Sequence, residues 1–238
     1  MFAFRDTADL GPGSPRVEVA FTDASVDLQG GPHKREAFAR TLAAVHAETG
    51  VSFARLNQAH GDRVIEVVDA WTPGLRHDIP IADALVTTRR DVGLMIRAAD
   101  CVPILLADPR AGVIGAVHAG RRGVALDIVT RAVARMRELG AEDISAWIGP
   151  HVCGRCYEVP EEMRAEVAAA VPATQAETSW HTPALDLGAG VVAQLAAAGV
   201  PAARVTRVDR CTLEDERLHS HRRDGDKSGR LAGLVWFS

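Results

Sequence analysis

The feature that most constrains this fold is a pair of short apolar runs in the middle of the chain, Val102–Ala107 and Val113–Val117. Both runs are rich in β-branched residues and have the length of buried strands. Asp108, Pro109 and Gly112 lie between them and predict a turn. Two strands joined by so short a connection run antiparallel. The start of the first strand and the end of the second should therefore lie side by side.

Residues that can carry chemistry stand at that shared end of the hairpin. Asp100 and Cys101 precede the first run, and His118 ends the second. A thiol beside an imidazole is the start of either a metal site or a nucleophile–base pair. A histidine that closes an apolar strand must be hydrogen-bonded or ligated, because burying an unsatisfied polar group is costly. By itself, however, a cysteine is more often a small buried hydrophobe than a nucleophile.

A second histidine, His60, lies in the turn Asn57–Asp62. A lone loop histidine is most often a solvated surface residue, although histidine is also a common ligand and base. Together with Cys101 and His118 it would supply three ligands and leave a position for water, which is the coordination of a catalytic rather than a structural zinc. Zinc in such a site lowers the pKa of its water to about 7.

The length of the chain, 238 residues, allows one large domain or two small ones. Because no repeat, low-complexity tract or linker divides it, we expect a single domain over residues 1–238. Strands come in groups rather than in regular alternation with helices. This favours an α+β fold, with mixed β-sheets layered with helices, over a doubly wound parallel sheet.

Composition narrows the class of protein. A hydrophobic content of 47% and a charged content of 24% are typical of a soluble globular protein. A net charge of -4 and a pI of about 6.1 argue against a nucleic-acid partner. No run is apolar enough to cross a membrane, and the N-terminus lacks the apolar core of a secretory signal. We expect a cytoplasmic enzyme, monomeric or weakly oligomeric, whose four cysteines are reduced.

Several further elements follow from periodicity and turn residues. A helix is expected from Lys34 to Gly50, and a single helix from the glycine-arginine turn at 120–123 to Gly140. Val51–Leu56 and Arg63–Asp69 are expected as partner strands. Loops are predicted over Trp71–Pro80 and over the charged segment 210–229.

Two polar motifs remain open on spacing alone. Cys153 and Cys156 form a C-x-x-C pair, but no second pair completes a zinc ribbon, so a structural turn is favoured over a metal or redox site. The motif Gly120-Arg121-Arg122-Gly123 opens a helix, where backbone N–H groups favour an anion, but two solvated arginines would look the same.

Six stretches of the chain resemble one known family. They are NQAHGDRV (57–64), DALVT (83–87), ADCVPILLAD (99–108), GVIGAVHAGRRG (112–123), IGPHVCGRCYEV (148–159) and SHRRDG–SGR (220–230). The order Q-x-H-G, A-D-C-x-P, H-A-G-x-R-G is similar to that of the YfiH-type "laccase domain" family. Its members were long labelled polyphenol oxidases and were later described as purine nucleoside phosphorylases. The match spans most of the chain from Asn57 onward.

The resemblance implies a zinc site made by His60, Cys101 and His118, the residues that the hairpin and the turn also single out. It implies mixed sheets layered with helices, and phosphorolysis of adenosine, inosine, guanosine and methylthioadenosine, with hydrolytic deamination of adenosine. The substrates would then be a small nucleoside and phosphate. The residues expected to bind them are Gln58, Arg122, Arg222 and Arg223, with Asp83 or Asp100 as a proton shuttle.

Three departures from the family pattern touch the expected pocket walls. The N-terminal loop reads FTDASVDLQGG (21–31), which is shortened and lacks an arginine found in the family. Arg121 replaces a tryptophan, and His221 replaces a tyrosine. The changes spare the expected metal ligands, so the resemblance supports the metal-dependent reaction better than it supports the identity of the substrate.

Three other functions are weighed against the zinc-dependent nucleoside enzyme. In a metal-free hydrolase, Cys101 would be the nucleophile and His118 or His60 the base, acting on an amide such as one in a cell-wall precursor. Copper-dependent phenol oxidation follows the older family label, but the chain has one H-x-H pair, His219 and His221, where multicopper oxidases need several. A zinc-stabilised nucleoside-binding module without turnover is the non-enzymatic alternative.

Overall fold

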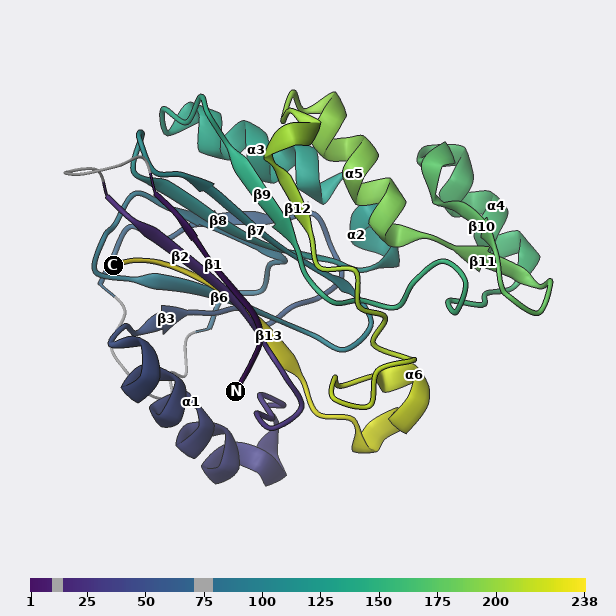
Figure 1. Ribbon diagram of the computed structural model, residues 1–238, viewed down its shortest axis with the longest axis horizontal. Helices are drawn as coiled ribbons and strands as arrows, with labels where there is room; N and C mark the ends of the chain where they lie inside the picture. Colours follow the sequence, from purple (N-terminus) through teal and green to yellow (C-terminus); the bar gives the residue numbers. More distant parts are fainter. Residues whose placement is uncertain (10–14, 71–78) are drawn as a thin grey trace.

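Two mixed β-sheets stack face to face, and helices cover the outer face of each (Figure 1). The computed structural model describes residues 1–9, 15–70 and 79–238. The five-stranded sheet has the order β1-β2-β13-β6-β3, formed by Phe2–Ala8, Val17–Thr22, Leu231–Phe237, Gly93–Ala98 and Phe53–Ala54. The six-stranded sheet has the order β12-β9-β7-β8-β5-β4, formed by Val205–Arg207, Ser145–Ile148, Val102–Asp108, Val113–Ala119, Ala84–Thr87 and Val64–Glu66.

The helices pack on the two outer faces. α1 (Arg35–Thr49) covers the five-stranded sheet, and α3 (Ile128–Glu138) and α5 (Leu187–Ala197) cover the six-stranded sheet (Figure 1). The remaining elements are α2 (Arg121–Ala125), α4 (Glu161–Ala170), α6 (His221–Asp224), the 3-10 turns Pro32–Lys34, Pro172–Thr174, Ala202–Arg204 and Gly225–Lys227, and the small sheet of β10 (Gln175–Glu177) and β11 (Pro183–Leu185). This layered α+β architecture confirms the predicted fold class.

The predicted hairpin is the centre of the six-stranded sheet. β7 and β8 pair antiparallel from Val102 opposite Ala119 to Asp108 opposite Val113. Alternate residues face opposite sides of the sheet: Ile104 packs against the helices, whereas Leu105 packs against the other sheet. Burial on both faces explains why these strands read as continuous apolar runs rather than as alternating patterns.

Other boundaries differ from the sequence-based expectations. β3 and β4, which lie within the predicted partner strands, belong to different sheets, where β3 pairs with β6 and β4 with β5. The helix expected up to Gly140 is broken into α2 and α3 at Asp127, whose φ is 61°. Leu126, an apolar residue within the expected helix, is 43% exposed because it falls in this break. Most of the loop predicted at Trp71–Pro80 lies outside the described residues.

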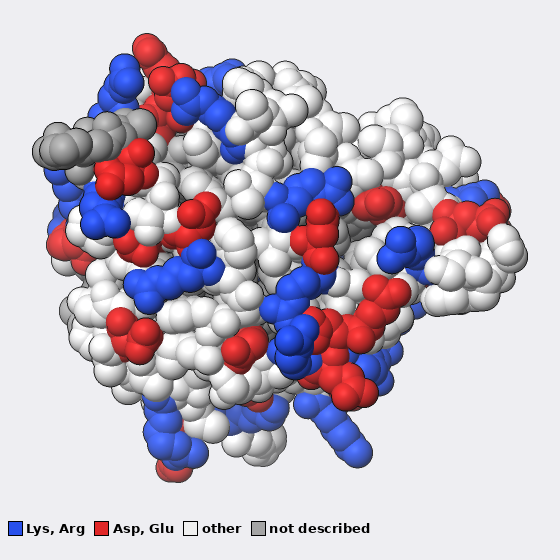
Figure 2. Space-filling model, in the orientation of Figure 1, with Lys and Arg blue, Asp and Glu red and all other residues white. Residues whose placement is uncertain are grey.

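The distribution of charge on the surface and the length of the helices concern two kinds of partner, nucleic acid and membrane. On the face shown in Figure 2, acidic and basic side chains are interspersed over the surface. Among the described residues, none of the helices has the length and apolar character needed to span a membrane.

The buried carboxylate of Asp108 joins the tip of the hairpin to the loop that precedes β9. It accepts hydrogen bonds from the backbone N–H groups of Ala111 at 3.0 Å, Glu142 at 2.8 Å and Asp143 at 2.8 Å. Burial alone would raise the pKa of Asp108, but these N–H groups outweigh burial and lower it.

We predict that Asp108→Asn lowers the free energy of unfolding at pH 7 by about 1–3 kcal/mol, because an amide leaves buried N–H donors poorly satisfied. The native pKa is below the unfolded value, so the contribution of ionised Asp108 is full above an unfolded pKa of about 3.9 and is lost as the pH falls through the native value. Urea unfolding near neutral and acidic pH tests this, with exposed Asp226→Asn as control. A deficit that does not shrink in acid would contradict the prediction.

Candidate active site

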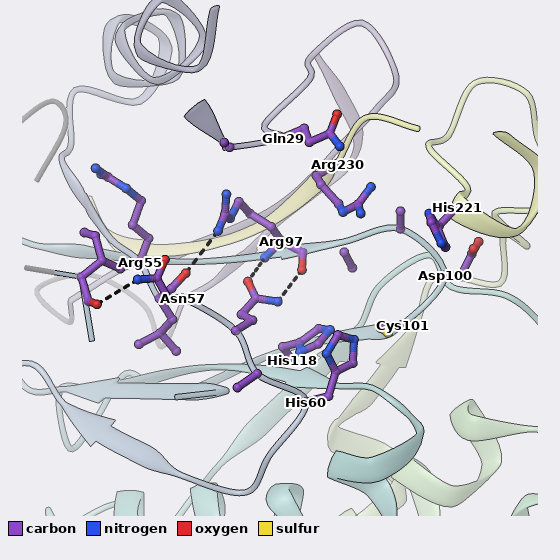
Figure 3. A pocket seen from close by; sticks show the side chains of 18 of the residues that line it. Gln29, Arg55, Asn57, His60, Arg97, Asp100, Cys101, His118, His221 and Arg230 are labelled. Atoms are coloured by element: carbon purple, nitrogen blue, oxygen red, sulfur yellow. Dashed lines mark hydrogen bonds between the residues drawn. The ribbon is translucent and has the colours of Figure 1, made fainter. Parts of the chain in front are cut away.

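A cavity of about 1030 Å³ opens where the chain crosses from β6 of one sheet to β7 of the other (Figure 3). Its lining comes from the loops around residues 29–31 and 55–60, from the β6–β7 crossing, and from α1, α2 and α6. Seven residues predicted for the site line this cavity: Gln58, His60, Asp100, Cys101, His118, Arg122 and Arg222. Arg223, also predicted to bind substrate, is not among the residues that line it.

Gly120 faces Cys101 across the end of the hairpin and leaves room for His60 beside it. Val102 lies opposite Ala119, so Cys101 and Gly120 follow as the next facing positions. Gly120 has no side chain, and a Cβ there would lie 2.7 Å from Cδ2 of His60 and 3.1 Å from Sγ of Cys101. The glycine is therefore needed for His60 and Cys101 to approach each other.

Asp83, which directly precedes β5, positions both histidines. Its Oδ1 lies 2.9 Å from Nδ1 of His118 and accepts the backbone N–H of His60 at 2.9 Å. Its Oδ2 accepts the N–H groups of Ala59 at 3.2 Å and Gly61 at 2.7 Å. These bonds hold His60 at a φ of 58°, a left-handed conformation that a histidine rarely adopts. Asp83 is 1% exposed and does not line the cavity, and its carboxylate positions the turn of His60 and the ring of His118.

The three predicted ligands converge. One ligand atom each from His60, Cys101 and His118 lies within 4.8 Å of the other two. The two imidazole rings are 4.9 Å apart and nearly perpendicular, at 77°. Because Asp83 takes Nδ1 of His118, the other ring nitrogen is free to bind a metal, the usual arrangement around a ligating histidine. Two imidazoles and a thiol that face a cavity therefore fit a catalytic metal ion.

The charges within this group stabilise Cys101 as a thiolate. Burial alone would raise the pKa of Cys101, but the neighbouring His118 and His60 lower it to about 6. Burial alone would lower the pKa of His118, but Cys101 and Asp83 raise it to about 9. The sulfur is thus a thiolate near neutral pH, which is the form that binds metal and the form that attacks carbonyl carbon.

Asp100, the second candidate for the proton shuttle, is also fully engaged. Its Oδ1 accepts the hydroxyl of Thr212 at 2.6 Å, and its Oδ2 accepts the backbone N–H of Arg222 at 2.6 Å. Its φ of 85° turns the chain sharply just before Cys101. Asp100 lines the cavity, and these bonds attach the segments 211–215 and 220–224 to the cysteine loop.

Gln58 and the two C-terminal arginines make contacts that the sequence did not indicate. The amide of Gln58 bonds the backbone of Arg97 twice, at 2.6 and 2.9 Å. Arg222 lies over the ring of Tyr157 at 4.9 Å, within the cavity wall. The guanidinium of Arg223 instead donates to the carbonyl oxygens of Thr212 and Leu218, each at 2.8 Å. Arg223 therefore stabilises its own loop.

The structure adds two arginines that sequence reasoning did not place in the site. Arg97 and Arg230 line the cavity, and their guanidinium groups donate hydrogen bonds to backbone carbonyl oxygens of residues that the structure describes. Burial, with the like charges of Arg55 and Arg230, lowers the pKa of Arg97 to about 10, so it stays protonated at neutral pH. An arginine inside the otherwise apolar strand Gly93–Ala98 was the signal that could have revealed it.

We predict that Gly120→Ala weakens zinc binding by roughly 10- to 100-fold, the range seen when groups that orient metal ligands are lost. The added methyl would displace His60 and Cys101, while the backbone at this position accepts alanine, with φ of -79°. Competition with a chelating dye measures the affinity. The control is Gly61→Ala, whose methyl would lie at an ordinary 3.5 Å from Asp83. Equal affinity in both variants would contradict the prediction.

Comparisons with known proteins agree with the fold and with the predicted family. A protein named purine nucleoside phosphorylase from Streptomyces griseus is 55% identical over 184 residues, covering 76% of this chain and 73% of that protein. One of the same name from Streptomyces coelicolor is 53% identical over 203 residues, covering 83% and 81%. The crystal structure of YfiH, a hypothetical protein from Bacillus licheniformis, superposes with a TM-score of 0.81 at 23% identity, covering 97% and 98%.

The resemblance to the YfiH-type family is thus confirmed. The family model described as multi-copper polyphenol oxidoreductase laccase matches residues 25–238, which include every residue of the site described above. This chain belongs to that family.

Proposed function

We propose that this protein is a zinc-dependent purine nucleoside phosphorylase. The observation that carries the proposal is the presence, in one cavity, of three potential metal ligands and of two arginines, Arg121 and Arg122, that have no carboxylate partner among the residues that the structure describes. Support comes from the relatives named purine nucleoside phosphorylase, several of which are 42–55% identical to this chain. Adenosine, inosine, guanosine and methylthioadenosine are the proposed substrates, with phosphate as co-substrate.

His60, Cys101 and His118 would hold the ion. Zinc would supply Lewis-acid polarisation of a bound oxygen without a change of oxidation state. Phosphorolysis transfers a glycosyl group and needs no redox partner, so we favour Zn²⁺ over copper for the same three donors. A cysteine and two histidines also suit copper, which is the alternative ion.

The arginines of α2 are the proposed phosphate-binding groups. The guanidinium groups of Arg121 and Arg122 line the cavity and make no hydrogen bond or ion pair with any residue that the structure describes. Their donors are therefore available to an anion, and charge-assisted hydrogen bonds from guanidinium to phosphate are among the stronger polar contacts. Arg97 and Arg230 add positive charge on the opposite wall, which comes from the five-stranded sheet and its loops.

The reaction requires a phosphate oxygen to attack C1′ of the ribose while the bond from C1′ to the purine nitrogen breaks. The purine leaves with the bonding electrons and takes up a proton. The cavity walls would orient the two substrates, and much of the rate enhancement would come from holding them together in that orientation. Tyr157, beneath Arg222, offers an aromatic ring to a flat base.

One observation favours a second candidate, the cysteine hydrolase. The lowered pKa of Cys101 beside the protonated His118 is typical of a nucleophile–base pair. In that enzyme Cys101 would attack an amide carbonyl and no metal would be required. The same thiolate cannot be both a metal ligand and a free nucleophile, so the two functions are separable by experiment.

We predict that zinc-loaded wild-type protein releases hypoxanthine from inosine only when phosphate is present, and that Cys101→Ala abolishes this release. Product formation followed by chromatography measures it, and ammonia release from adenosine tests deamination in the same samples. The metal content of both proteins is measured alongside. Blue copper-containing protein would instead point to the oxidase.

Zinc should also protect Cys101 of the wild-type protein from alkylation by iodoacetamide. Alkylation of Cys101 that zinc or a chelator leaves unchanged, with no turnover of any nucleoside, would favour the hydrolase over the phosphorylase. Tight nucleoside binding by the zinc-loaded protein without product would identify the non-catalytic binding module.

We predict that Arg121→Gln and Arg122→Gln each raise the KM for phosphate by about tenfold or more, which corresponds to a loss of about 1.4 kcal/mol or more of charge-assisted binding. The KM for inosine should change less. Arg110→Gln removes the same charge from an exposed position in the β7–β8 turn and serves as control. Unchanged KM values for phosphate in both α2 variants would remove these arginines from the phosphate site.

A further inference from the structure

The C-x-x-C pair, which the proposed function does not use, is part of a second cluster of potential metal ligands. Cys153 and Cys156 lie beside Cys211 and Glu214, and one ligand atom from each of the four lies within 4.8 Å of the others. None of the four lines the catalytic cavity. In the sequence, 54 or more residues separate the pair from its new neighbours, so spacing alone could not reveal the set.

Backbone hydrogen bonds hold this cluster together. The N–H of Cys156 bonds the carbonyl of Cys153 at 3.0 Å, which closes the turn that places both thiols on one side. The segment after β9 then runs parallel to the segment after β12, with a bridge between His151 and Cys211 and a bond from the N–H of Thr212 to the carbonyl of His151 at 3.0 Å. The convergence of the sulfurs is thus fixed by main-chain contacts.

The donor set has the chemistry of a closed structural site. Three thiols and one carboxylate supply four ligands, the number that tetrahedral structural zinc uses. The backbone N–H of Cys153 also points to Sγ of Cys211, at 3.4 Å, and such a contact stabilises a thiolate. Cys156 is buried, whereas Glu214 is exposed and lines a shallow depression together with Cys211, which gives an ion access from solvent.

The cation next to the cluster is already paired. Arg210 adjoins Cys211, and its guanidinium bonds the carboxylate of Asp215 at 2.8 Å.

We infer that Cys153, Cys156, Cys211 and Glu214 bind a structural Zn²⁺ ion, distinct from the ion proposed for the catalytic cavity. Binding would release the thiol protons and form zinc–sulfur and zinc–oxygen bonds without any oxidation. A disulfide between two of these cysteines would instead need an oxidant and would leave the third thiol and Glu214 unused. Soft thiolates select zinc over the oxygen-seeking ions Mg²⁺ and Ca²⁺.

Such an ion would stabilise the wall of the cavity. Thr212, next to Cys211, donates to Asp100, and Asp100 also accepts the N–H of Arg222. The backbone N–H of Val152, next to Cys153, bonds the carbonyl of Asp100 at 3.0 Å. An ion at the second site would thus hold together the two segments that bond the loop of Cys101. It would do so whichever reaction the cavity catalyses.

The test is the zinc content of intact protein purified under reducing conditions with added zinc and then freed of loosely bound metal. We expect Cys101→Ala, which removes the cavity site, to retain one tightly bound Zn²⁺ per chain, and the double variant Cys101→Ala/Cys156→Ser to retain none. Glu214→Gln should weaken retention, whereas Glu216→Gln, a matched change at an exposed residue close by, should not. Cys101→Ala protein that retains no zinc would overturn the inference.

Cobalt spectroscopy covers the case in which Cys156→Ser does not fold. Co²⁺ bound to Cys101→Ala should give the d–d bands of tetrahedral coordination and a strong sulfur-to-cobalt charge-transfer band from three thiolates. Glu214→Gln should alter the d–d bands while leaving the charge-transfer band. Weak, octahedral-type bands would overturn the inference, and so would an intact mass that shows a disulfide within the cluster of the reduced-purified protein.

Discussion

The buried carboxylate of Asp83 joins two of the three segments that carry the candidate metal ligands. It accepts three backbone N–H groups from residues 59–61 and lies 2.9 Å from Nδ1 of His118. A carboxylate with 1% exposure survives in the interior only when its oxygens are satisfied in this way. Burial alone would raise the pKa of Asp83, but its bonds to His118 and the N–H groups lower it, so it remains charged. The turn of His60 and the strand of His118 therefore take fixed positions before any ion binds, which is the preorganisation that a metal site needs.

How far the sequence predicts this arrangement depends on the range of the contacts involved. The β7–β8 hairpin, and with it the proximity of Cys101 and His118, follows from local pattern because the connection is short. The approach of His60 follows from the resemblance to a family but not from spacing, since it depends on Asp83 from a distant strand. The break between α2 and α3 at Asp127 was missed because apolar periodicity continues through it, although Leu126 ends up 43% exposed. The place of Arg97 in the cavity wall was not predicted, because the apolar residues of its strand indicate a buried strand and give no sign that its one arginine faces a cavity.

The positive charge of the cavity has a cost that a bound anion would offset. Arg97 is buried near Arg55 and Arg230, and these like charges, together with burial, lower its pKa to about 10. A phosphate in the cavity would relieve the repulsion, so the charges that destabilise the empty pocket would favour the proposed co-substrate. The departures from the family pattern fall on the same walls, since Arg121, His221 and the loop residues 29–31 all line the cavity. Arg121 in place of the aromatic residue of the family exchanges a stacking surface for a cation, and under the proposed function this would favour phosphate over the base.

Asp100 connects the cavity to the C-terminal part of the chain. Its φ of 85° is a conformation that costs a non-glycine residue about 1–3 kcal/mol unless its surroundings enforce it. Hydrogen bonds from the hydroxyl of Thr212 and the N–H of Arg222 hold Asp100 in this conformation. Both donors come from the part of the chain that also carries Cys211. The cysteine cluster and the catalytic cavity thus share one strained residue between them. A change that loosens the segment after β12 should therefore reach Cys101 through Asp100, even though neither Cys211 nor Thr212 lines the cavity.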